Sequence, residues 1–131
     1  MIPVAELKKI AHARLDDAKA LLAAGRFDAA TYLCGYAVEL ALKARICRTL
    51  SWSDFPRTPG EFQSYRSFRT HDLEVLLHLS GQEARITQQH FALWYVLVVW
   101  TRELRYNPIG TAQSDAAEAM IAAAETLRTV L

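Results

Sequence analysis

The spacing of apolar residues along the chain predicts helices and no strand. From Val4 to Leu22 apolar residues recur with the period of one helix face, and Gly25 ends this first helix. A second helix is predicted over residues 29–50, because that segment contains no proline and is rich in alanine and leucine. No segment alternates polar and apolar residues for long enough to indicate a β-strand.

The predicted second helix lacks a polar face. Asp28 is its predicted N-cap, and between residues 29 and 42 the only charged residue is Glu39. A helix that is apolar nearly all round is buried on more than one side. Glu39 should therefore meet a cation, because a lone buried carboxylate is strongly unfavourable. Lys43, one turn later, has the spacing of a partner.

The helical pattern dissolves over residues 51–69. Pro56, Pro59 and Gly60 exclude a continuous helix there and predict a long connector. Residues 43–69 carry six cations and two anions, which makes this the one basic stretch of the chain. Loops of this length without structure of their own are usually functional or mobile.

Three further helices are predicted after the connector. They span 71–79 with Thr70 as the cap, from about 83 or 87 to 106 before Asn107-Pro108, and from Thr111 or Ser114 to the end of the chain. The chain is thus predicted to form one all-α domain, residues 1–131. Its expected architecture is an up-and-down bundle of about five helices, with the long connector between the second and third.

Composition and charge agree with an ordinary globular domain. Hydrophobic residues make up 52% and charged residues 22% of the 131 residues, and the formal net charge is +1. No whole-molecule field therefore draws the protein to nucleic acid or to an anionic membrane. The longest apolar run, 91–100, is about half of the roughly 20 residues that cross a bilayer. We expect a cytoplasmic protein without a membrane segment.

The two cysteines are not expected to pair. Cys34 and Cys47 lie thirteen residues apart on one predicted helix, which is about 19 Å. A disulfide needs Cα atoms within about 7 Å. Two unpaired thiols suit a reducing compartment.

No standard catalytic or cofactor motif is present, and the four histidines lack the spacing of metal ligands. We therefore expect no metal and no cofactor. The candidate functional residues instead form a predicted polar cluster, in which Glu39 contacts Arg102 or Arg105 from the end of the fourth predicted helix. The members of this predicted cluster, as a ligand site or an ion network, are Tyr36, Glu39, Lys43, Arg102, Arg105 and Tyr106.

A second copy of the chain is also expected. The block 91–100 and the apolar second helix offer more apolar surface than a five-helix monomer hides on one core side. A homodimer would cover the excess.

Four landmarks in the right order resemble the HEPN family, the higher eukaryotes and prokaryotes nucleotide-binding domain. They are the stretch 18–43 with Gly35-Tyr36-Ala37-Val38-Glu39, then Thr70-His71-Asp72-Leu73, then Trp100, and finally Arg105-Tyr106. The resemblance implies a bundle of about five helices that is usually dimeric. It also implies nucleotide binding, or pairing with a minimal nucleotidyltransferase in toxin-antitoxin or defence systems.

Many HEPN proteins are metal-independent RNases that carry an arginine followed by a histidine after four to six residues. No histidine follows Arg102 or Arg105, but a string with this spacing runs from Arg66 to His71 in the connector. The leading interpretation is therefore a non-catalytic binding module for a nucleotide or a partner nucleotidyltransferase. The alternatives are an RNase using Arg66 and His71 across a dimer, which would act on RNA, and a purely structural helical interaction domain.

Overall fold

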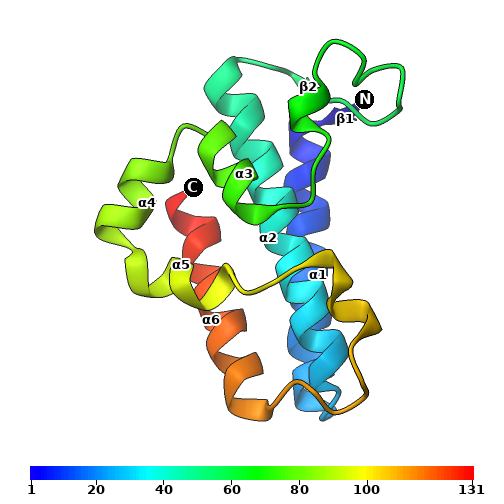
Figure 1. Ribbon diagram of the computed structural model, residues 1–131, viewed down its shortest axis with the longest axis vertical. Coiled ribbons are helices and arrows are strands. Elements are labelled where there is room, and N and C mark those ends of the chain that lie inside the picture. Colours follow the sequence, from blue (N-terminus) through cyan, green and yellow to red (C-terminus); the bar gives the residue numbers. More distant parts are fainter.

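Two long helices packed side by side form the frame of the molecule (Figure 1). The computed structural model describes residues 1–131. Helix α1, Val4–Ala23, begins after Pro3 and buries Leu7, Ala11 and Leu15, which share one face. Gly25, at φ +73°, allows the tight turn into α2, Phe27–Leu50.

Helix α2 is the central helix, as its sequence predicts. Eleven of its 24 residues are buried, and the run 37–40, which is one complete turn, has no exposed side. Helices α1, α3 and α6 all pack against it. Both cysteines are buried in α2 as free thiols, as expected from their separation.

The connector between α2 and α3 is packed against the frame. Residues Asp54–Phe55 (β2) pair antiparallel with Ile2–Pro3 (β1), a two-residue bridge too short to produce an alternating pattern. Phe55 is 1% exposed and Phe62 is 7% exposed, with ring centroids 6.0 Å apart. The second half of the connector contains a 3₁₀ turn, η1, Arg66–Phe68. Phe55 and Phe62 thus extend the core into the connector.

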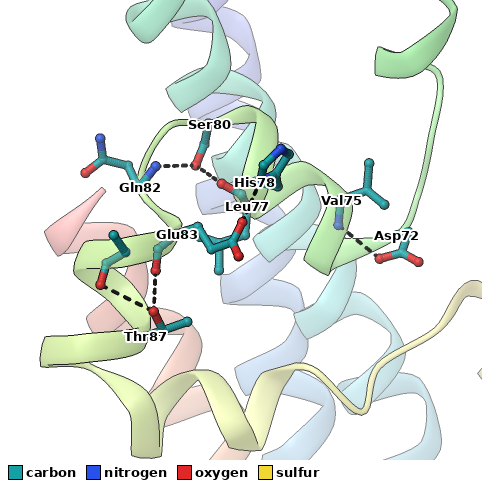
Figure 2. Close-up of polar contacts among 9 residues, drawn as sticks. Asp72, Val75, Leu77, His78, Ser80, Gln82, Glu83 and Thr87 are labelled. Atoms are coloured by element: carbon teal, nitrogen blue, oxygen red, sulfur yellow. Dashed lines mark hydrogen bonds and ion pairs between the residues drawn. The ribbon is translucent and has the colours of Figure 1, made fainter.

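Helix α3, Leu73–Leu79, is capped by Asp72 and not by Thr70 as the sequence suggested (Figure 2). The Asp72 carboxylate accepts hydrogen bonds from the backbone N–H groups of Glu74 at 2.9 Å and Val75 at 3.2 Å. Aspartate and threonine both cap well. Thr70 lies two residues too early, and its hydroxyl accepts a hydrogen bond from the N–H of Asp72 instead.

The single fourth helix predicted over 83–106 is wrong, because the chain breaks there twice. The segment contains α4, Glu83–Gln89, then α5, Phe91–Leu97, and finally a 3₁₀ turn, η2, Arg102–Tyr106. His90 interrupts the first part with a φ of −133°. Val98 and Val99, which follow the end of α5, are β-branched residues with a lowered helix propensity.

Trp100 explains why the helix does not resume after α5. A Cβ added to Gly35 would lie 2.1 Å from the Trp100 ring, so the indole occupies the space that a side chain on α2 would take. The indole Nε1 also donates a hydrogen bond to the carbonyl oxygen of Tyr32 at 3.1 Å. Trp100 therefore anchors the segment after α5 to α2.

Helix α6, Ser114–Val130, returns along α1 and α2 and completes the bundle (Figure 1). Asp28 is not the N-cap of α2. Its carboxylate accepts hydrogen bonds from the N–H groups of Gly110 at 2.7 Å and Ala112 at 2.8 Å, which tie the loop before α6 to the start of α2. The all-α fold class is confirmed, and none of the helices has both the length and the apolar character needed to cross a bilayer.

Candidate functional site

Glu39 lies buried in the middle of α2 and contacts two basic side chains. Its Oε1 accepts a hydrogen bond from Lys43 Nζ at 2.7 Å and lies 2.8 Å from Nδ1 of His71. Glu39 is 2% exposed, Lys43 14% and His71 46%. Burial raises the pKa of the nearby Tyr36 hydroxyl, and the Glu39 carboxylate adds to that effect. We call Glu39, Lys43 and His71 the Glu39 cluster.

The expected contact of Glu39 with Arg102 or Arg105 is wrong. Both arginines lie on the 3₁₀ turn η2, and both are exposed. Arg105 stacks over the ring of Tyr106, with its guanidinium carbon 4.8 Å from the ring centroid. The turn η2 does contact α2, but neither of its arginines pairs with Glu39, whose ion-pair partners are Lys43 and His71. The chain entering α3 supplies His71 in their place.

His71 also lines a cavity of about 470 Å³ between the start of α3 and the segment that follows α5. Its lining consists of His71, Asp72, Leu73, Glu74, Val98, Trp100, Thr101, Arg102 and Glu103. Arg66, the suggested partner of His71 for RNA cleavage, is not part of it. The cavity holds three carboxylates and one arginine, so its charge is unfavourable for a phosphodiester.

The Glu39–His71 pair is nonetheless built like a proton-transfer pair. A buried carboxylate that contacts one ring nitrogen fixes the orientation of an imidazole and leaves the other nitrogen free. In a triad of nucleophile, histidine and carboxylate, this pair would be the histidine and the carboxylate. The nucleophile is missing, because no serine, cysteine or threonine forms a hydrogen bond with His71. No group of three or more His, Cys, Asp and Glu side chains is arranged to hold a metal ion.

A second feature is an exposed apolar face on α5, formed by Phe91 (63% exposed) and Tyr95 (66%). Three further large apolar side chains are exposed on the segment that follows α5: Val99 (68%), Tyr106 (74%) and Ile109 (100%). The Phe91 and Tyr95 rings lie one turn apart with centroids 6.1 Å apart. A groove of about 450 Å³, lined mainly by apolar residues, lies between the first half of α6, the start of α2 and the segment 96–112, which begins in α5.

A third feature, which the sequence did not reveal, is a cavity of about 310 Å³ lined by Lys8, Arg45, Arg48 and Arg128. We call it the cationic cavity. The basic character of residues 43–69 points towards Arg45 and Arg48. Lys8 and Arg128 give no such signal, because they meet the other two only when α1, α2 and α6 are packed together.

Comparison with protein families gives one match, to the HEPN domain, over residues 4–60. Comparison with curated proteins and with solved structures found no significant match. The matched stretch includes α1, α2 and the first part of the connector, and therefore Glu39 and Lys43 but not His71. The resemblance seen in the sequence is thus confirmed over residues 4–60, where this all-α chain matches the HEPN domain.

Proposed function

We propose that this HEPN-like chain is a non-catalytic binding module that works as a homodimer. The observation that carries the proposal is the exposed apolar face. Phe91 and Tyr95 are neighbours that are 63% and 66% exposed, and the sequence of α5, FALWYVL, contains no charged residue. Adjacent exposed aromatic side chains are typical of interaction sites on soluble proteins.

A second copy of the chain is the occupant that this face fits best. A two-fold interface places the same patch on both partners, so an uncharged patch is self-complementary without charge pairing. Phe91 and Tyr95 supply aromatic anchors of the type that dominates interface energies. The groove beside α6 offers a concave surface to receive such an anchor.

The charge around His71 supports a binding role over RNA cleavage. Asp72, Glu74 and Glu103 line the same cavity and would repel a phosphate. The alternative RNase interpretation keeps one supporting observation, the pairing of His71 with the buried carboxylate of Glu39. A carboxylate–histidine pair is a common arrangement for proton transfer, but Arg66 does not join it.

Light scattering after size-exclusion chromatography tests the assembly. At micromolar concentration we expect about twice the chain mass of 14.7 kDa. Tyr95→Glu should give a monomer, because it places a charge in the surface that the dimer would bury. Val75→Glu is the matched control, since Val75 is also exposed (40%) but lies on α3. A monomeric wild-type protein, or a Tyr95→Glu variant that remains dimeric, would contradict the proposal.

A further inference from the structure

The cationic cavity brings together charges from three helices. Lys8 comes from α1, Arg45 and Arg48 come from α2, and Arg128 comes from the last turn of α6. The remaining lining is small or apolar: Ala11, Ala41, Ala44, Thr129 and Leu131. No Asp or Glu side chain lines it, so four cations face at most one anion, even if a terminal carboxylate at Leu131 is counted.

The donors of this cavity are largely uncommitted. Arg45 Nη1 donates a hydrogen bond to the carbonyl oxygen of Leu131 at 2.6 Å, and its Nε donates one to Thr49 Oγ1 at 3.4 Å. The side chains of Lys8, Arg48 and Arg128 form neither an ion pair nor a hydrogen bond. By contrast, four cations elsewhere in the chain form ion pairs with carboxylates: Lys9, Arg14, Lys19 and Lys43.

The like charges in this region act on one another. Burial lowers the pKa of the Arg45 guanidinium, and the charges of Arg48 and Arg85 lower it further. No Asp or Glu side chain pairs with any of the four cations that line the cavity. An anion in the cavity would relieve the repulsion and accept hydrogen bonds from guanidinium groups, whose planar fork matches phosphate geometry.

We propose that the cationic cavity binds a small anion with several phosphate groups, of the di- or triphosphate class, and recognises it through its phosphates alone. The lining contains no aromatic ring on which a base could stack and no carboxylate or amide side chain that could read a base edge. A recess of about 310 Å³ suits a compact anion better than a chain that tracks along a surface. The lining shares no residue with the apolar face, so the inference does not depend on dimerisation.

Titration calorimetry with inorganic tripolyphosphate at low ionic strength tests this site. We expect saturable binding that Arg48→Glu and Arg128→Glu each weaken about tenfold or more, because each removes charge-assisted hydrogen bonds and adds repulsion. Arg57→Glu is the matched control, with the same charge change at an exposed position in the connector, and should bind like the wild type. ATP should bind within a few-fold of tripolyphosphate, and adenosine should not bind.

Several outcomes would overturn the inference. They are the absence of saturable tripolyphosphate binding, an equal loss in Arg57→Glu, or ATP binding without tripolyphosphate binding. Binding of single-stranded RNA that grows with length and ignores Arg48→Glu and Arg128→Glu, with tripolyphosphate unbound, would place phosphate recognition elsewhere. Circular dichroism melting checks that the variants fold, and Lys8→Glu, at an exposed position on α1, provides a third variant with the same expected loss.

Discussion

Glu39 shows what a sequence can reveal about one residue and what it cannot. Its burial followed from the apolar helix around it, and its pairing with Lys43 followed from the one-turn spacing. His71 lies 32 residues away and reaches Glu39 only because the connector folds back onto α2. A local pattern holds no information about that contact.

Removing the Glu39 carboxylate should destabilise the fold. Glu39→Ala leaves the partly buried Lys43 ammonium and the contacting nitrogen of His71 without their carboxylate partner. We therefore expect a loss of about 2–3 kcal/mol in the free energy of unfolding. Urea unfolding measures the change. Glu83→Ala is the matched control, because Glu83 also contacts a histidine, His78, but both side chains are more than half exposed.

The control variant should change the free energy of unfolding by no more than about 0.5 kcal/mol. If Glu39→Ala has the same urea midpoint as the wild type, Glu39 is not buried against these cations in solution.

At the scale of elements, the helices that depend on local signals were predictable. The apolar stripe of α1 and the uninterrupted apolar run of α2 are properties of neighbouring residues, and both helices form close to the expected bounds. The segment 83–106 has an equally helical composition, yet it breaks at His90 and after Leu97. The second break depends on Trp100 meeting Gly35, a contact between residues far apart in the sequence. After this break Arg102 and Arg105 lie exposed on η2, and neither pairs with Glu39.

Gly35→Ala tests the anchoring of Trp100. The added methyl group would lie 2.1 Å from the indole, so the ring must leave its site or α2 must shift. We expect a loss of about 2–3 kcal/mol in the free energy of unfolding, as for other overpacked sites, and a red shift of the tryptophan fluorescence. Gly60→Ala is the control, because a Cβ at Gly60 meets no atom within 4 Å. Equal stability of the two variants would show that Trp100 does not occupy the Gly35 slot.

At the scale of the whole molecule, a net charge of +1 conceals two sites of opposite character. The cavity beside His71 contains three carboxylates and one arginine, and the cationic cavity contains four basic side chains without a carboxylate side chain. The net charge argued against a general attraction to nucleic acid, but composition could not predict that negative and positive side chains would gather in separate cavities. The separation also places the histidine suited to proton transfer and the cations suited to phosphate in different cavities.

We therefore expect no metal-independent RNase activity. Cleavage needs a proton-transfer group and a cation at the same phosphate, and His71 shares its cavity with Asp72, Glu74 and Glu103 while Arg66 lies outside it. Incubation of the purified protein with single-stranded and structured RNA in EDTA should give no more product than the His71→Ala variant gives. Cleavage by the wild type that disappears in both His71→Ala and Arg66→Ala would instead establish the RNase interpretation. Cleavage that persists in both variants would exclude Arg66 and His71 as its source and would leave a contaminating nuclease or the Arg85–His90 pair, which has the same spacing.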